Sequence, residues 1–263
     1  KGDSLLEDVA LSVIYKIEFE TYIDDGEKNA DQTLKQRNSY VGLRGGFGTV
    51  KAGKFDTPLK KAQGKFDLFG DLSGDIKAVM EGENRASNIL QYSSPKIADG
   101  VVLTAAIIPG EESTDSEADG PADGLSASIS YKNDTLYLAL AIDSKIDGQD
   151  TQRLVVSYSV DDLTVSGMVQ SAETTDGSLY AHGENSADST GVSIAYKIDK
   201  NTLKLQYVDS DSTSSVAAGE QLSLGVDHKL SKKTKLFAFY TDQDAIATSN
   251  QTSYIGFGLE HKF

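Results

Sequence analysis

Three histidines are the side chains of this sequence that best suit acid–base or nucleophilic catalysis. A serine-hydrolase site needs a histidine within hydrogen-bond reach of a nucleophile, with an acid to orient the ring. His182 falls in a long polar segment, His228 beside a predicted short turn, and His261 two residues from the end. No G-x-S-x-G or H-E-x-x-H motif accompanies them, so a serine hydrolase or zinc enzyme is not indicated. We expect no catalytic residue and no enzymatic activity.

Carboxylates are the abundant reactive groups, and they give the sequence a formal net charge of −15. A chain this acidic is not expected to bind nucleic acid through a general phosphate-neutralising surface. Two polar segments, 109–124 and 173–190, concentrate the acids. Hard cations such as Ca²⁺ prefer carboxylate oxygens, so these segments are either solvated loops or places where divalent cations bind. There is no cysteine and no EF-hand pattern, and we expect no cofactor or dedicated metal site.

Apolar and polar side chains alternate with a period of two through almost the whole sequence. Between 9 and 19 the odd positions are apolar and the even ones mostly polar, as a strand between two different media requires. The pattern predicts fourteen strands, at 9–21, 36–45, 49–56, 86–94, 101–108, 125–132, 135–144, 152–159, 164–172, 191–199, 202–209, 220–230, 234–243 and 251–263.

Short and long connections alternate between these strands. The short ones are 45–48, 96–100, 133–134, 160–163, 200–201 and 231–233, and the long ones are 22–35, 57–85, 109–124, 145–151, 173–190, 210–219 and 244–250. No run of about 18 apolar residues occurs, so a membrane-spanning helix is excluded. A meander whose two ends differ in this way predicts a single all-β domain over 1–263, a transmembrane antiparallel barrel with short turns at one end.

Three stretches carry a resemblance to the general porins of Gram-negative bacteria. Residues 37–58, RNSYVGLRGGFGTVKAGKFDTP, resemble a strand, a tight turn around GxFG and the next strand of that family, and 227–240 resemble its penultimate hairpin. The end, YIGFGLEHKF, is similar to the last strand of outer-membrane proteins, whose terminal aromatic residue, here Phe263, is the signal for barrel assembly. The resemblance implies a homotrimer of sixteen-stranded barrels in the bacterial outer membrane.

Two of those sixteen strands are missing from the fourteen that the pattern predicts. Residues 1–8 are interpreted as the turn after the second strand, so the first hairpin is expected to be absent from this sequence. A fourteen-stranded remnant would leave two unpaired edges in lipid, where each unsatisfied backbone group costs several kcal/mol.

Segment 57–85 is the longest connection and differs from the others because it contains many apolar residues. By resemblance it is the third external loop, which folds into the barrel and narrows the channel. Its acids are expected to face basic residues on the opposite wall across a narrow aqueous gap, where the field sorts solutes by charge. The expected constriction residues are Asp67, Asp71, Asp75 and Glu81 on the loop and Arg37, Lys54 and Arg85 on the wall.

Residue parity complicates two of these wall positions. Arg37 has the parity of Val41, and Lys54 that of Val50, both of which should face lipid. Either a bulge shifts the phase or the two basic residues lie at the rim. Lys16 and Arg44 have lumen parity and are expected to line the pore.

These observations predict a passive, water-filled porin for ions and small hydrophilic solutes. Its partners would be outer-membrane lipid and lipopolysaccharide, the latter bridged by cations such as Ca²⁺ at the acidic loops. The net charge favours cations, but local arginines could reverse the preference. The alternatives are a substrate-specific channel of the same architecture, a soluble acidic β-protein such as an adhesin, and an outer-membrane hydrolase.

Overall fold

The computed structural model describes residues 2–6, 11–21, 33–110, 120–180, 183–211, 219–245 and 250–262. One antiparallel sheet of fifteen strands forms the body of the molecule, and each strand pairs with its neighbours in chain order. The strands of this sheet are β1 (Gly2–Leu6), β2 (Leu11–Lys16), β5 (Ser39–Gly45), β6 (Gly48–Asp56), β7 (Arg85–Ser93), β8 (Val101–Ile108), β9 (Gly124–Lys132), β10 (Leu136–Ile146), β11 (Gln149–Val160), β12 (Leu163–Thr174), β13 (Ser186–Ile198), β14 (Asn201–Ser210), β15 (Glu220–Lys229), β16 (Thr234–Ala245) and β17 (Asn250–His261).

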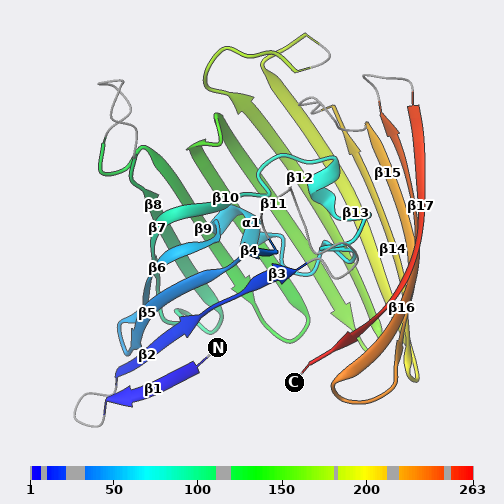
Figure 1. Cartoon of the computed structure of the whole chain (residues 1–263), viewed down its shortest axis with the longest axis horizontal. Coiled ribbons are helices and arrows are strands. Elements are labelled where there is room, and N and C mark those ends of the chain that lie inside the picture. The colour runs from blue at the N-terminus through cyan, green and yellow to red at the C-terminus, as the bar shows by residue number, and fades with distance from the viewer. Residues whose placement is uncertain are drawn as a thin grey trace.

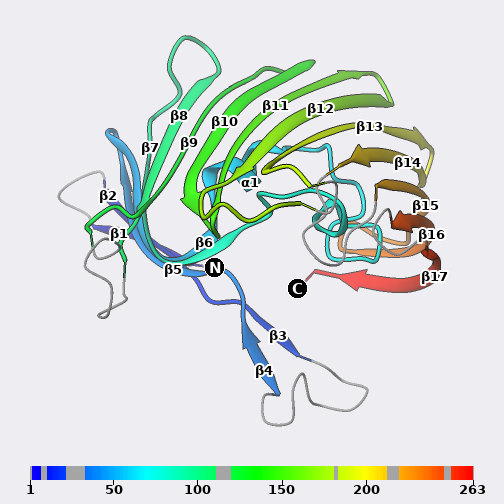
Figure 2. The same ribbon diagram turned by 90° about the horizontal axis from the view of Figure 1, so that it is seen from above.

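The sheet curls into a barrel-shaped wall around the segment between β6 and β7, as Figures 1 and 2 show. β1 and β17 stand at the two ends of the strand order, and no pairing joins them within the described residues. β3 (Phe19–Thr21) and β4 (Leu34–Gln36) form a separate two-stranded ribbon that extends away from the wall (Figure 2). Among the described residues, no helix has the length and apolar character needed to cross a membrane.

Strands occupy all fourteen predicted ranges, although the range 9–21 is divided into β2 and β3, which belong to different sheets. The predicted all-β class is confirmed. The prediction was wrong for residues 1–8, because Gly2–Leu6 is a strand, in register with β2 from Gly2–Tyr15 to Leu6–Leu11. Five residues are too few for the alternation to be read from sequence, and pairing with β2 supplies their backbone hydrogen bonds.

The predicted long connection at 145–151 is also wrong. β10 continues to Ile146 and β11 begins at Gln149, which leaves a two-residue turn. Asp147 and Gly148 both have positive φ, 56° and 74°. An Asp-Gly pair with positive φ at both positions is typical of the tight turn that joins right-twisted strands.

The wall has two chemically different faces. Leu140, Ile142 and Tyr158 are 56%, 51% and 51% exposed on the outer face, although their side chains are apolar. Gln206, Ser223 and Thr241 are fully buried on the inner face, although theirs are polar. An apolar exterior around a polar interior is the arrangement of a barrel that sits in lipid and holds water.

The apolar core lies between the inner face and the segment that crosses it. This segment contains α1 (Pro58–Ala62) and the 3₁₀ helix η1 (Ile76–Ala78). Thr57 caps α1 by accepting a hydrogen bond from the Lys60 amide at 3.2 Å, and Pro58 supplies a suitable backbone angle for the first turn. The core comprises Leu59, Ala62, Phe66, Ile76, Val79 and Met80 of the segment and Ala139, Ala141, Val155, Met168 and Val208 of the wall.

Candidate functional site

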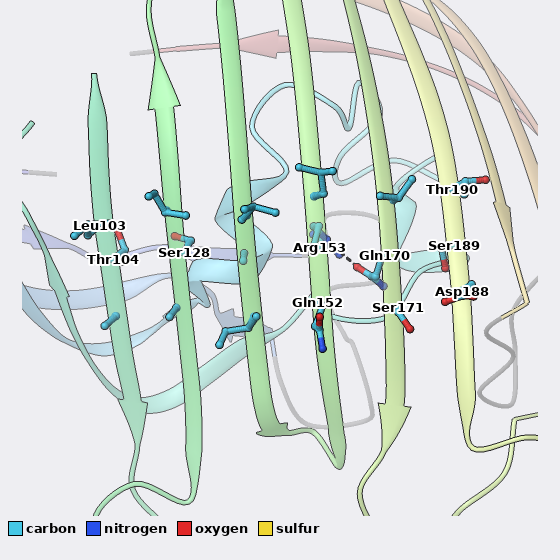
Figure 3. Close-up of a pocket in the computed structure, with 18 of the residues that line it drawn as sticks. Leu103, Thr104, Ser128, Gln152, Arg153, Gln170, Ser171, Asp188, Ser189 and Thr190 are labelled. Atoms are coloured by element: carbon cyan, nitrogen blue, oxygen red, sulfur yellow. Dashed lines mark hydrogen bonds between the residues drawn. The ribbon is translucent and has the colours of Figure 1, made fainter. Parts of the chain in front are cut away.

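The segment 57–84, called the inner loop below, is attached to the wall at its base by Arg153. This side chain projects inward from β11 and is completely buried. Its guanidinium pairs with the Glu83 carboxylate at 2.7 Å and donates to the Glu81 carbonyl at 3.0 Å and to the Gln170 amide oxygen at 2.7 Å. Gln170 itself donates to the Glu81 carbonyl at 2.9 Å. Figure 3 shows the Arg153–Gln170 bond between β11 and β12.

The tip of the inner loop is held by three glutamines on neighbouring strands. Gln206 accepts from the Leu68 amide at 2.8 Å and donates to the Gly74 carbonyl at 3.1 Å. Gln221 donates to the same carbonyl at 2.7 Å, and Gln243 donates to the Ser73 carbonyl at 2.9 Å. Gln206 and Gln221 are fully buried, and hydrogen bonds of buried amides to main-chain groups are costly to break, so the tip is fixed to the wall of β14–β16.

Two glycines on the inner face make room for the aromatic rings of the loop. Phe66 and Phe69 are fully buried. A Cβ at Gly191 would lie 2.5 Å from the Phe66 ring, and one at Gly225 would lie 2.7 Å from the Phe69 ring. The path of the loop therefore depends on the absence of side chains at these two wall positions.

Arg37 and Asp71 meet across the molecule. The Arg37 guanidinium pairs with the Asp71 carboxylate at 2.6 Å, and it lies 3.4 Å and 3.5 Å from the carboxylates of Glu18 and Glu20. Arg37 lies in the break between β4 and β5, outside the ladder, so the strand parity of Val41 does not set its direction. The structure thus brings Arg37 to the inner loop.

Asp75 was expected to face basic residues of the wall, but its carboxylate bonds within the inner loop instead. Its carboxylate accepts from the Lys77 amide and the Asp71 amide, both at 2.9 Å, and its side chain is only 10% exposed. Asp75 therefore shapes the turn that presents Asp71 instead of lying open to solvent. Glu81 is half-buried, and its backbone carbonyl accepts the hydrogen bonds from Arg153 and Gln170.

Asp67 is the carboxyl of the inner loop whose pKa is shifted from its ordinary value. Burial raises the pKa of Asp67 to about 7, and the negative charge of Asp75 adds to this shift. The side chain is therefore neutral at pH 6 and ionised at pH 8.

We expect that raising the pH from 6 to 8 makes the channel less favourable to anions, because a negative charge appears on the loop. One unit charge about 10 Å from a passing ion in water changes the energy of that ion by about 0.4 kcal/mol. This energy corresponds to an about twofold change in the permeability of the ion. Reversal potentials in a KCl gradient at the two pH values measure the change. Asp67→Asn should abolish the part centred near pH 7, whereas an unchanged pH profile would exclude Asp67 as its origin.

Arg85 lies at the base of the inner loop rather than opposite its acids. Its guanidinium donates to the Asp56 carboxylate at 2.9 Å and to the Asn38 amide oxygen at 3.1 Å. Lys61 pairs with the same carboxylate at 2.7 Å, and Lys60 lies 4.0 Å from it. Asp56 is buried, so several cations share one shielded carboxylate.

Lys51 is an inward basic residue that the sequence analysis missed. Its ammonium lies 3.8 Å from the centre of the Phe55 ring and 4.9 Å from that of Tyr40. Lys16, Lys61 and Asp56 are near enough for their charges to act on it, but no carboxylate lies within ion-pair distance among the described residues. Strand parity could have found it, since Val50 and Ala52 occupy the outer face.

The other expected residues have simpler surroundings. Lys54 has the outer-face parity of Val50, is half-buried and forms no ion pair within the described residues. Lys16 lies on the face of the buried Ile14 and pairs with Glu18. Arg44 is exposed near the turn that joins β5 and β6. Phe263 lies outside the described residues, as do the acids at 111–119.

A hollow of about 1070 Å³ lies along the wall of β7–β13. Its apolar lining includes Leu103, Ile129 and Leu140, which are exposed on the outer face, and Figure 3 labels Leu103 among the lining residues. These exposed lining residues have the parity of the lipid-facing side chains, whereas Arg153, Gln170 and Ser189 of the same lining are buried.

Comparisons with known proteins agree with this architecture. The family model described as Gram-negative porin matches residues 4–247. The major outer membrane protein P.IB of Neisseria meningitidis serogroup A is 24% identical, over 96% of this chain and 78% of that protein. Outer membrane porin protein 32 of Delftia acidovorans is 27% identical, over 87% of this chain and 70% of that protein.

Solved structures have the same fold. The anion-selective porin from Comamonas acidovorans has a TM-score of 0.80 at 22% identity, over 99% of this chain and 87% of that one. The trimer form of Vibrio cholerae OmpT has a TM-score of 0.59 at 16% identity, over 98% and 87%. The family match spans most of the sequence, the fold is that of an outer-membrane barrel, and a polar interior is crossed by an inner loop. The chain belongs to the Gram-negative porin family, and it is a diffusion channel of the bacterial outer membrane.

Proposed function

We propose that the passage between the inner loop and the wall of β2 and β5–β7 is the selective constriction, and that it favours small anions. Lys16 of the wall and Lys61 of the inner loop are close enough to Lys51 for their charges to act on it. The acids beside them are already paired, Glu18 with Lys16 and Arg37, and Asp56 with Lys61 and Arg85. Lys51 is the observation that carries the proposal, because its charge has no carboxylate partner among the described residues.

This selectivity is opposite in sign to what the net charge of −15 favours. Most acids lie at the long-loop end, and salt screens their charges over about 8–10 Å. Charges within the narrow passage act at shorter range on a passing ion and therefore dominate the choice. The similar Comamonas acidovorans porin is anion-selective, which agrees with the proposal.

The test is the single-channel current in a planar bilayer with a KCl gradient, for the wild type, Lys51→Gln and Lys54→Gln. The wild type should give stepwise, ohmic openings with a reversal potential of the anion-selective sign. Lys51→Gln should lower the permeability of anions and raise that of cations by about twofold each, or about fourfold in the ratio. Lys54→Gln is the matched control, since it removes the same charge three residues away on the outer face. A cation-selective wild type, or equal effects of both variants, would contradict the proposal.

Three partner assignments are also proposals. We infer a homotrimer, because one of the similar structures is a trimer form, and cross-linking in detergent would test it. The apolar outer face fits contact with outer-membrane lipid. Divalent-cation bridging to lipopolysaccharide stays a prediction: within the described residues, no group of three potential ligands converges on a cation site.

A further inference from the structure

The second half of the chain separates its charges along the barrel axis. From 154 to 263 the sequence contains eight lysines and no arginine: Lys197, Lys200, Lys204, Lys229, Lys232, Lys233, Lys235 and Lys262. Each lies within a few residues of a short turn or beside the chain end next to one. The acids of the opposite ends include Glu173, Asp176, Glu184, Asp188, Asp211, Glu220 and Asp244. The short-turn ends of this half also carry Asp161, Asp162, Asp199, Asp227 and Glu260, so eight lysines face five acids there. This part of the mouth is therefore basic on balance in a chain that is acidic overall.

Six of these lysines surround one pocket of about 190 Å³, called the lysine pocket below. It is lined by Lys200, Lys229, Lys232, Lys233, Lys235 and Lys262, together with Asp227, Glu260, Thr202, Ser231 and Thr234. The inward-facing members share strand parity with the buried Gln206, Ser223 and Thr241. The lysine pocket therefore opens toward the lumen, where a dissolved solute reaches it and a lipid headgroup does not.

Only part of this positive charge is neutralised. Lys235 pairs with Asp227 at 2.9 Å and with Glu260 at 3.0 Å, and Lys262 pairs with Glu260 at 3.2 Å. Lys204 also uses Asp227, at 2.9 Å. The remaining four lining lysines, Lys200, Lys229, Lys232 and Lys233, are exposed and form no ion pair within the described residues.

The backbone holds the lysines together before any ligand arrives. The Lys229 amide donates to the Lys200 carbonyl at 2.8 Å, which joins two neighbouring hairpin ends. The Lys262 amide donates to the Lys233 carbonyl at 2.8 Å, which joins β17 to the β15–β16 turn. Fixed positions lower the entropic cost of gathering several like charges around one ligand.

The pocket also connects to the inner loop. The Lys204 ammonium donates to the Leu68 carbonyl at 3.0 Å and lies 4.9 Å from the centre of the Phe69 ring. Lys204, Asp227, Lys235 and Glu260 thus form a continuous chain of ion pairs from the loop tip to the mouth.

We propose that the lysine pocket is a binding site for soluble multivalent anions of the oligophosphate class, reached from the short-turn side of the membrane. Four unpaired ammonium groups suit a ligand with several closely spaced negative charges better than a single chloride. A multivalent anion bound there occupies the lumen and reduces the ion current. The site is distinct from the constriction at Lys51, so the two can be tested separately.

The test uses tripolyphosphate as the probe on single channels in KCl. The orientation of each channel in the bilayer is determined with the variant Thr175→Cys, which places a cysteine in the exposed long loop after β12 of a chain that has no other cysteine. The thiol is labelled with a biotin maleimide. Streptavidin added to one chamber then shows which side of the membrane the long loops face. Tripolyphosphate should reduce the current at lower concentration from the short-turn side than from the long-loop side. Replacing Lys200, Lys229, Lys232 and Lys233 by Gln should raise the half-blocking concentration about tenfold, since each exposed charge contributes a modest amount.

The control is Lys96→Gln with Lys132→Gln, which removes two lysine charges at two other short turns outside the pocket. It should leave the half-blocking concentration unchanged, and all variants should keep ohmic openings, which shows that they are folded. Equal block from both sides, or no change in the fourfold variant, would overturn the inference. Neither result would bear on the Lys51 experiment, which uses only KCl.

Discussion

Arg153→Met should detach the base of the inner loop from the wall and produce larger, noisier single-channel currents. The substitution removes the 2.7 Å partner of the Glu83 carboxylate, which is only 5% exposed, and leaves it Lys60 at 3.7 Å. It also removes the donors to the Glu81 carbonyl and to Gln170. Removing one partner of a buried ion pair costs about 3–5 kcal/mol, enough to make release of the loop cheaper than keeping the charge buried.

The matched variant is Arg153→Met combined with Glu83→Gln, which removes both charges of the pair. Replacing a buried pair as a whole is far less costly than breaking it, so this variant should be more stable than the single one and its currents quieter. Conductance, current noise and the temperature at which the folded barrel is lost on a gel would be compared. Wild-type currents in the single variant would mean that Arg153 does not hold the loop.

Gly191→Val should displace the inner loop by a different route, through steric conflict at its aromatic anchor. A Cβ at Gly191 lies 2.5 Å from the Phe66 ring, which is completely buried and has no free space to move into. Overfilling a packed core costs about 1–3 kcal/mol of stability. The wall strand is held by its neighbours, so the inner loop rather than the strand should shift to relieve the clash. We expect altered conductance and a lower unfolding temperature.

Two companion variants make this result specific. Gly167→Val lies on the adjacent strand β12, where a new Cβ would come no closer than 3.9 Å to its nearest neighbour, the Gly191 carbonyl oxygen, so it should be nearly neutral. Phe66→Ala added to Gly191→Val removes the ring that clashes, and it should restore part of the lost stability. Equal effects of Gly167→Val and Gly191→Val would show that the strands, rather than the loop contact, are sensitive.

Local sequence was sufficient for the strands and for the difference between the two ends of the barrel. In a strand, successive side chains point to opposite faces, so the order of residues alone assigns each one to a face. The apolar content of 57–85 also correctly indicated a loop that packs inside the wall. Parity failed to find Gly2–Leu6, which is too short, and the Asp147–Gly148 turn was missed although the Asp-Gly signal was present.

Which charges meet was decided by the tertiary structure. Arg37 and Asp71 are 34 positions apart, and Arg153 and Glu83 are 70 apart. Their distances depend on the path of the inner loop, which is set where Phe66 and Phe69 pack on Gly191 and Gly225. Such contacts arise only after the sheet has curled and brought distant strands around one interior. The sequence by itself determined a porin barrel with an inner loop and, through strand parity, that Lys51 rather than Lys54 faces inward. The packing of that loop decided that Arg37 reaches Asp71 and that Arg153 reaches Glu83.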